Sequence, residues 1–411
     1  MDEDKSKFLV TLAYGRLSAL EIASILDRDS LDFEILRVSD RAVLVECDSK
    51  TAKSLIRETG GSYKIARIFG ETIEELYEEI TLPDEAKFNW TVSGYDCDSE
   101  LLENTKLSVQ SFLKSRSLGK SRFIPPNAES EDDDRKTPGN LKELKIKDVF
   151  ERILFPEGKI PEGLDIVVAG GFAKGPLFGC TLAASDVLGF QKRDFSRSYQ
   201  NPTMTLGPRL GRILVNLGMK YGGGTLLDPF CGLGTILQEA LMTGRNVVGV
   251  DISQSNVDKT RTNLDWIQRN YQATRKLSVT LIRANAMNLS KEKIPPVEGI
   301  AAEPILLPKY EKNPTATCAK EDLSEVSNLY ERSLKALRGL LKEESRIAVV
   351  APVVIDDRGR EHKLKLSQPL KEMDFRFFNP NVSGLRNEYP FRVPTLKRKI
   401  VQREVYVMAV G

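Results

Sequence analysis

The chain has 411 residues, of which 41% are hydrophobic and 29% are charged, and its 60 Lys and Arg against 58 Asp and Glu give a net charge of +2. A chain of this length exceeds one ordinary hydrophobic core, so we expect about two or three domains. The near-neutral charge excludes a uniformly basic nucleic-acid-binding protein, and any RNA contact must come from local basic patches.

Residues suited to metal or redox chemistry are few. The five cysteines are widely spaced, which argues against a disulfide framework or a CxxC zinc site and fits a reducing cytoplasm. The single histidine, His362, lies in a charged stretch and is expected to be a solvated loop residue rather than a base or a metal ligand. The acidic N-terminus does not resemble a signal peptide, and no apolar run is long enough for a membrane span. We therefore expect a soluble, cytoplasmic protein without a bound metal.

The first segment alternates strand-like and helix-like patterns. Strands are predicted at 8–13, 33–38, 42–46 and 63–68, and helices at 19–26 and 49–59. This β-α-β-β-α-β order is that of a ferredoxin-like sandwich. We assign it to an N-terminal domain of residues 1–75.

A second domain is predicted over residues 76–196. Its elements are a strand at 87–92, a helix at 100–118, and strands at 164–169 and 178–184. The acidic run at 128–139 cannot bury surface and is predicted to be a loop. Basic side chains interleaved with Ser and Phe lie at the end of this helix and just after it and could contact an RNA backbone, with a merely solvated helix face as the alternative. These are Lys114, Arg116, Lys120 and Arg122.

The last domain, residues 197–411, has a different pattern of short apolar runs separated by helical stretches. The runs lie at 225–227, 246–250, 278–282, 298–302 and 346–350. Continuous apolar strands alternating with helices indicate a parallel sheet covered on both faces. Two further strands, 375–378 and 404–410, are predicted to form an edge hairpin. The fold class is therefore α/β, with a doubly wound, Rossmann-like sheet preceded by α+β domains.

A glycine-containing turn follows the first strand of this sheet, in the string DPFCGLGT at residues 228–235. Glycines let a ligand approach the backbone, and the start of the next helix offers free N–H groups. Asp251 ends the next strand nineteen positions after Gly232, where an acid that binds ribose hydroxyls is expected. A dinucleotide and S-adenosylmethionine both use such a crevice, but Leu237 replaces the third glycine of the dinucleotide motif.

The string DPFCGLGT resembles the first motif of class I methyltransferases that act on amino groups or nucleic acids. The resemblance implies S-adenosylmethionine as the cofactor, with its methionine end near Asp228 and the glycines. Asn285 stands where that family usually has an Asp near the adenine. The cofactor-binding residues that the resemblance implies are Asp228, Pro229, Phe230, Gly232, Gly234, Asp251 and Asn285.

The amino-methylating branch of these enzymes carries Asp-Pro-Pro-Tyr after the fourth strand, where this chain has Glu303-Pro304-Ile305-Leu306. In that branch the acid and the following carbonyl hold the target amine, and the Tyr stacks on the base. The resemblance implies Glu303 and Pro304 as catalytic positions, with Tyr310 as a candidate replacement for the missing ring. Three interpretations stay open: methylation of a base through other contacts, methylation of another target, and loss of catalysis with RNA binding retained.

A second resemblance lies at the start of this domain, upstream of the glycine turn, in RSYQNP at 197–202 and LGPRLGRILVNL at 206–217. These strings are similar to the corresponding segment of the archaeal and eukaryotic tRNA guanosine-10 N2-methyltransferases. Those enzymes place a ferredoxin-like segment and a THUMP RNA-binding domain before the catalytic domain, which fits the order predicted here. TLKRKI at 395–400 is similar to a further motif of the family. With Lys399 and Arg403, its basic residues Lys397 and Arg398 form a second candidate RNA-binding patch.

The resemblance therefore implies an S-adenosylmethionine-dependent RNA methyltransferase that acts on a guanine N2 amine, with tRNA or another structured RNA as its partner. The alternative is a non-catalytic RNA-binding or assembly protein that retains the methyltransferase fold. A DNA or protein amino-methyltransferase is disfavoured by the THUMP-like layout.

Overall fold

The structure is a computed structural model that describes residues 5–29, 32–82, 88–116, 118, 121–125, 163–200, 206–307, 310–380, 382, 385, 389–394 and 400–411. The predicted acidic loop at 128–139 lies outside the described residues, as do Lys120, Lys397, Arg398 and Lys399. The chain divides into two compact units. The first comprises Met1–Ile22, Ser30–Gly189 and Val382–Gly384, and the second Ala23–Asp29, Phe190–Asn381 and Leu385–Gly411.

The first unit is built on one mixed sheet with the strand order β2-β3-β1-β4-β8-β7-β5-β6. Its strands are β1 (Ser6–Leu12), β2 (Glu34–Val38), β3 (Ala42–Cys47), β4 (Ser62–Gly70), β5 (Asn89–Tyr95), β6 (Arg122–Phe123), β7 (Gly163–Ala169) and β8 (Leu177–Ala184). The helices α2 (Ser49–Glu58), α3 (Ile73–Glu79) and α4 (Ser99–Ser115) belong to this unit, and α1 (Arg16–Arg28) and α7 (Val187–Phe195) are divided between the units.

The order β2-β3-β1-β4, all antiparallel, is that of the predicted ferredoxin-like sandwich. Antiparallel pairing of β4 with β8 joins these strands to the second predicted segment without a break in the sheet. A buried ion pair lies at this join, where Lys64 Nζ is 2.6 Å from Asp165 Oδ2. The hydroxyls of Ser93 and Thr181 also donate hydrogen bonds to Asp165, at 2.8 and 2.6 Å.

Polar side chains at the helix starts explain where several helices begin. Asp48 precedes α2 and accepts hydrogen bonds from the backbone N–H groups of Lys50 and Thr51. Thr72 and Glu75 form a capping box at the start of α3. These acceptors satisfy N–H groups that have no partner inside the helix.

The second unit is built on a nine-stranded sheet whose main path runs β11-β10-β9-β12-β13-β17-β15. Its strands are β9 (Thr225–Asp228), β10 (Asn246–Asp251), β11 (Val279–Arg283), β12 (Gly299–Ala302), β13 (Arg346–Ile355), β14 (Glu361–Lys363), β15 (Phe375–Phe377), β16 (Phe391–Arg392) and β17 (Val401–Val410). Its helices are α8 (Pro208–Gly218), α9 (Thr235–Met242), α10 (Gln254–Asn270), α11 (Ala316–Arg338) and α12 (Ser367–Glu372), with 3-10 turns η1 (Gln272–Thr274) and η2 (Ala286–Asn288).

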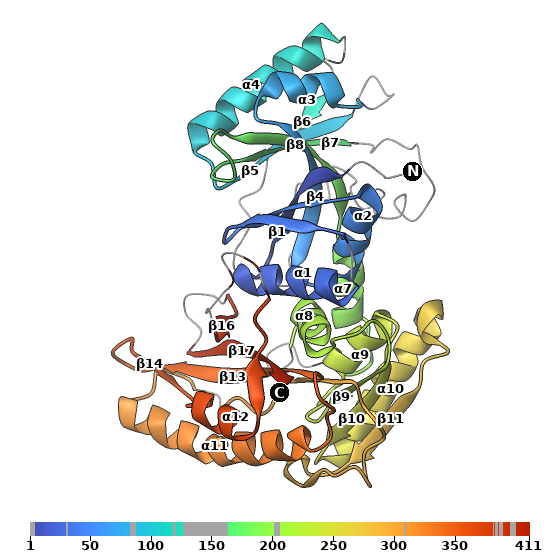
Figure 1. Cartoon of the computed structure of the whole chain (residues 1–411), viewed down its shortest axis with the longest axis vertical. Coiled ribbons are helices and arrows are strands. Elements are labelled where there is room, and N and C mark those ends of the chain that lie inside the picture. The colour runs from blue at the N-terminus through green and yellow to red at the C-terminus, as the bar shows by residue number, and fades with distance from the viewer. Residues whose placement is uncertain are drawn as a thin grey trace. The chain divides into compact units, whose positions relative to one another are not determined.

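Strands β11, β10, β9, β12 and β13 are parallel, and helices cover both faces of the sheet. Helices α8, α9 and α10 pack on one side, and α11 and α12 pack with the apolar core on the other, as can be followed in Figure 1 from green and yellow to orange. The predicted doubly wound sheet is confirmed. The strand order reverses between β9 and β12, and ligands of such sheets bind beyond the carboxyl ends of the strands at this point.

The prediction of an edge hairpin at the end of the chain was wrong in part. Strands β15 and β17 do pair antiparallel, but β17 lies between β13 and β15 and pairs with β13 along its length. Its run from Glu404 to Met408 is buried. Of these two strands, only β15 lies at an edge of the described sheet. No helix in the described residues is both long and apolar enough to cross a membrane.

Candidate active site

The glycine turn after β9 has the backbone conformation that its sequence predicts. Gly232 and Gly234 have φ angles of +51° and +85°, which L side chains rarely adopt. Gly234 precedes the first residue of α9, and no side chain caps that helix start. Among the described residues, a Cβ at position 232 would meet nothing closer than the Phe230 carbonyl oxygen at 3.9 Å, so they leave space open above this glycine.

Asp251 at the end of β10 ties the turn to the neighbouring strand. Its Oδ2 accepts the Gly232 N–H at 3.1 Å, and its Oδ1 accepts the Ser253 N–H at 2.8 Å. The side-chain amide of Asn256 donates to both carboxylate oxygens at 3.2 Å. These contacts fix the carboxylate where β9 and β10 end side by side.

Asp228, the last residue of β9, is almost completely buried, with 1% of its surface exposed. The pKa of this carboxyl is raised to about 8: burial is the largest cause, the hydrogen bond from Phe230 N–H opposes the shift, and the negative charges of Asp251 and Glu303 contribute to it. Asp228, Asp251 and Glu303 therefore form a concentration of acidic groups at the carboxyl edge of the sheet. Pro229 is buried, and Phe230 packs against the core of the unit.

The segment at 197–200 is fastened to the same turn, which the sequence did not predict. The buried Arg197 donates a hydrogen bond to Thr235 Oγ1 at 2.9 Å, at the start of α9. Asn263 of α10 accepts the Tyr199 N–H at 3.0 Å and donates to the carbonyl oxygens of Tyr199 and Leu233 at 3.0 and 2.9 Å. One buried amide thus joins this segment, the glycine turn and α10.

Two residues near the expected adenine position have clear local roles. Asn285 Oδ1 accepts the Met287 N–H at 3.0 Å and caps η2. Ile252, which follows Asp251, is 67% exposed. The exposed branched side chain of Ile252 lies next to Asp251 and offers apolar contact to a flat ligand. Its position directly after this acid was the sequence feature that could have indicated it as a binding residue.

Glu303 follows β12, the strand next to β9, and it is held in an ion pair. Arg403 Nε of β17 donates to Glu303 Oε1 at 2.6 Å. The side chain of Arg403 is 18% exposed and that of Glu303 is 14% exposed. Arg403, which we expected in an RNA-binding patch, is therefore directed to the proposed catalytic acid. The buried Pro304 follows Glu303.

The loop after Pro304 is anchored from α11. The buried Tyr330 hydroxyl donates to the Val350 carbonyl at 3.1 Å and lies 3.5 Å from that of Ile305. Burial and the charge of Glu303 raise the pKa of Tyr330. Tyr310, the candidate stacking ring, has its hydroxyl bonded to Asp322 and packs against the core. Ile305 is instead the exposed apolar side chain beside Glu303, at 63%.

The basic residues expected to contact RNA are only partly described. Lys114, Arg116 and Arg122 are exposed at the end of α4 and in β6. The Arg116 guanidinium lies over the Phe112 ring, 5.4 Å from its centroid. These three positions stay predictions for RNA contact.

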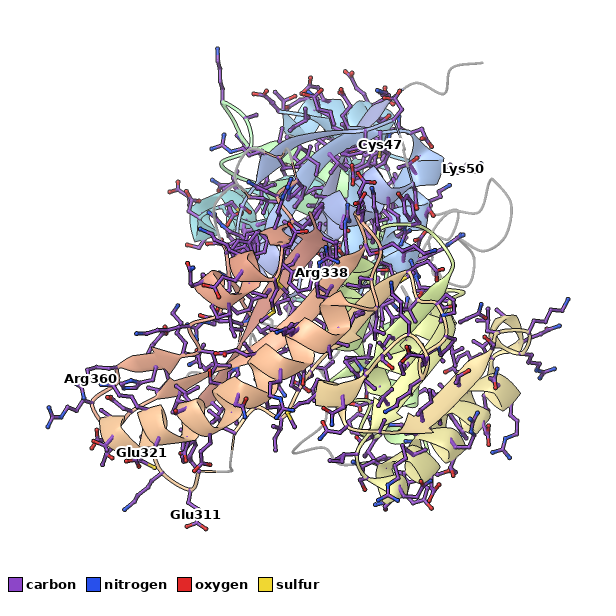
Figure 2. All side chains as sticks on the ribbon, turned by 60° about the horizontal axis from the view of Figure 1, so that its bottom comes forward. Cys47, Lys50, Glu311, Glu321, Arg338 and Arg360 are labelled. Carbon is purple, nitrogen blue, oxygen red and sulfur yellow. The ribbon has the colours of Figure 1, made fainter. Side chains whose placement is uncertain are left out.

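The prediction that His362 is a solvated loop residue was wrong. His362 lies in β14 with 13% of its side chain exposed, and its Nε2 is 2.9 Å from Asp356 Oδ2. Asp356 also accepts from Arg360 Nε at 2.8 Å, and Figure 2 marks Arg360 in this turn. Although burial opposes it, hydrogen bonds from His362 and Arg360 hold the pKa of Asp356 below its usual range. Within the described residues, no cluster of His, Cys, Asp and Glu could hold a metal ion.

The residues at this edge fit S-adenosylmethionine. Open space above Gly232, an uncapped start of α9 and an acid ending β10 suit a nucleoside with an amino-acid end. The surrounding carboxyl groups suit the positive charges of its sulfonium and ammonium groups. When bound, the cofactor supplies a methyl group on sulfur that a nitrogen atom can accept.

Comparison with known proteins agrees with this geometry. Residues 196–356 match the RMKL-like methyltransferase domain family. A tRNA (guanine(10)-N2)-dimethyltransferase of Methanothermobacter thermautotrophicus is 24% identical over 354 residues, which are 85% of this chain and 89% of that protein. A probable tRNA (guanine(10)-N2)-dimethyltransferase of Methanothermococcus thermolithotrophicus is 31% identical over 124 residues, 29% of this chain and 69% of that sequence.

Among solved structures, TrmN from Thermus thermophilus superimposes with a TM-score of 0.52 at 15% identity and covers 98% of this chain and 100% of its own. This likeness concerns the fold, and the predicted class I methyltransferase fold is confirmed. The resemblance drawn from the motifs and the choice of S-adenosylmethionine are confirmed as well. The chain belongs to the tRNA (guanine(10)-N2)-dimethyltransferase family, and its second unit contains an S-adenosylmethionine-dependent methyltransferase domain.

Proposed function

We propose that this protein transfers a methyl group from S-adenosylmethionine to the exocyclic N2 amine of a guanine in tRNA, at position 10 as in the names of its relatives. The names of the relatives support the substrate, and the methyltransferase domain supports the reaction.

The observation that carries the proposal is the placement of Glu303 at the reversal point of the sheet. The strand β12 that precedes Glu303 lies next to β9, which leads into the cofactor turn. A group bound at Glu303 is thus adjacent to the crevice where the methyl group is presented. Proximity of this kind accounts for much of the rate gain in group transfer.

The proposed chemistry needs three contributions from this chain. Glu303 accepts a hydrogen bond from the N2 amine, and its negative charge stabilises the positive charge that develops on nitrogen as the N–C bond forms and the C–S bond to the departing thioether breaks. The carboxylate of Glu303 then accepts the proton that the methylated nitrogen loses. The buried Pro304 keeps water from one side of the amine. Ile305 offers an apolar surface in place of the family's aromatic ring, so the base is held by packing without ring stacking.

Delivery of the tRNA is assigned to the segments before residue 197. We propose the division into a ferredoxin-like domain (1–75), a THUMP-like domain (76–196) and the methyltransferase domain (197–411). The exposed Lys114, Arg116 and Arg122 support RNA contact in the second of these. Replacing all three by Ala in the full chain is expected to weaken tRNA binding and reduce its salt dependence, because fewer counterions are released.

A cytoplasmic location is part of the same proposal. All five cysteines are free thiols, which suits a reducing compartment.

The test uses the full chain, labelled S-adenosylmethionine and two synthetic tRNAs that carry guanosine or inosine at position 10. Inosine lacks only the exocyclic amine, so methyl transfer to the guanosine tRNA alone would support the N2 amine as the target. Mass spectrometry of the nucleosides would name the product. Equal transfer to both tRNAs would contradict the proposed target atom, and cofactor binding without transfer to any RNA would favour the non-catalytic alternative.

A further inference from the structure

Glu303 and Arg403 are 100 residues apart in the chain and meet across an intervening strand. Strand β13 separates β12 from β17 in the sheet, and Arg403 lies opposite Pro352 of β13. The guanidinium must therefore extend over β13 to reach the acid beyond the end of β12. Because the two side chains are 18% and 14% exposed, solvent screens this ion pair less than a surface pair.

The ion pair changes the electrostatics of the acidic cluster. Glu303 adds negative charge beside the buried Asp228 and near Asp251, and like charges oppose one another at such a site. Arg403 supplies an opposite charge at the side of Glu303 where Oε1 lies. The guanidinium group is planar and always protonated, so its positive charge comes with N–H donors in a fixed geometry.

The contact also orients the carboxylate. Glu has one more rotatable bond than the Asp of the related motif, so its carboxylate needs a partner to hold one rotamer. The Nε–H donor fixes Oε1 at 2.6 Å, and no hydrogen bond to Oε2 is formed within the described part of the chain. One oxygen is thus held by the protein while the other remains available.

We propose that Arg403 is a positioning residue for methyl transfer: it holds Oε1 of Glu303 and thereby directs Oε2 to the amine of the substrate. This inference rests on the proposed function. Arg403 acts through Glu303 and does not itself contact the base in this scheme. Its role differs from that of a basic residue that binds RNA phosphates.

A double-mutant cycle tests the inference on the full chain. The variants are Arg403→Met, Glu303→Gln and the double variant, with Arg403→Lys as the conservative change. Arg392→Met is the matched control, because Arg392 pairs with Glu361 and Glu404 rather than Glu303. Turnover and KM for tRNA are measured for each variant, and cofactor affinity is measured by calorimetry.

We expect Arg403→Met to lower kcat by about 10- to 100-fold with KM and cofactor affinity nearly unchanged. In the Glu303→Gln background, Arg403→Met should lower kcat little further, because the carboxylate on which Arg403 acts is already absent. Arg403→Lys should recover part of the loss, and Arg392→Met should match the wild type. Ethylguanidinium added to Arg403→Ala should raise its turnover.

Two results would overturn the inference. An equal loss of kcat with and without Glu303→Gln would mean that Arg403 does not act through Glu303. A rise in KM with a smaller salt dependence and unchanged kcat would identify an RNA contact instead. If the wild type transfers no methyl group, the proposed function fails separately. The same cycle in urea unfolding then tests the pair, and additive stability changes would reject it.

Discussion

A single added methyl group at Gly234 probes the glycine turn most directly. With φ at +85°, Ala at this position adopts a left-handed backbone that costs about 1–2 kcal/mol. Its Cβ would also lie 2.9 Å from Cγ2 of Thr260, closer than real contacts allow. Thr260 cannot simply turn away, because its hydroxyl donates to the Gly232 carbonyl at 2.7 Å. The overlap should add about 1–2 kcal/mol.

A matched variant separates these two costs. Gly244 has φ at +79°, and a Cβ there would meet nothing within 4 Å in the part of the chain that the structure describes. Gly244→Ala should therefore show only the cost of the left-handed backbone and lower the free energy of unfolding by about 1–2 kcal/mol. Gly234→Ala, which adds the overlap with Thr260, should lower it by about 2–4 kcal/mol. Thr260→Ser removes Cγ2 and keeps the hydroxyl. Combined with Gly234→Ala, it should bring the loss close to that of Gly244→Ala.

Urea unfolding measures the free energies, and calorimetry with S-adenosylmethionine measures the effect on the crevice. We expect Gly234→Ala to weaken cofactor binding by about tenfold or more, since Thr260 carries the strain to the Gly232 carbonyl. Gly244→Ala should leave the affinity unchanged. If the two alanine variants are equally stable and bind the cofactor equally well, the argument through Thr260 is refuted.

Three further predictions concern charged groups. Asp251→Ala should weaken S-adenosylmethionine binding by about 1.4 kcal/mol or more, since it removes the proposed ribose acceptor, and unchanged calorimetric affinity would contradict this. The raised pKa of Asp228, about 8 against 3.8, means that between these values the folded protein holds a proton that the unfolded chain lacks. The free energy of unfolding should therefore fall by up to about 1.4 kcal/mol per pH unit as pH rises toward 8. Urea unfolding of Asp228→Asn, which lacks this proton, is the reference. Equal pH dependence of the unfolding free energy in the two proteins would contradict the prediction. Lys64→Met should lower the free energy of unfolding by about 3–5 kcal/mol, because it leaves the buried carboxylate of Asp165 without its positive partner. A loss below about 1 kcal/mol in urea unfolding would not fit a buried ion pair.

The parallel sheet was predictable because its strands carry their own signal. Runs such as Val247–Val250 of β10 are continuously apolar, as strands buried on both faces must be, and each is followed by a helical pattern. The ferredoxin-like strands were found in the same way from alternation and length. Local sequence decides these elements, so the predicted strands match the observed ones closely.

The place of β17 was harder to predict because strand order depends on pairing between distant segments. One signal was present in the sequence: residues 405–410 are continuously apolar, which suits an interior strand better than an edge. An antiparallel strand inserted between β13 and β15 cannot be derived from its own residues. His362 was misjudged for a different reason: its partner Asp356 is only 6 residues away, but it lies across a turn that the charged composition of this stretch does not reveal.

Buried charge in the second unit also escaped prediction. Glu239 of α9 is fully buried and accepts from Arg193 at 2.7 Å and from Arg212 at 2.7 Å. Burial alone would raise the pKa of Glu239, but the two guanidinium groups hold it below its usual range. These arginines come from separate helices, and a helical pattern alone does not indicate such a cluster.

The two halves of the candidate site differ in how they are encoded, which bears on the altered catalytic motif. The cofactor half comes from adjacent strands and a turn within one short stretch, so its motif is recognisable and changes in it are easily judged. The substrate half brings together Glu303 after β12, Tyr330 of α11 and Arg403 of β17, which the fold alone makes neighbours. A ring lost from the motif after β12 can therefore be offset by contacts from other elements. Replacement of the aromatic residue by Leu306 is for this reason a weak argument against catalysis.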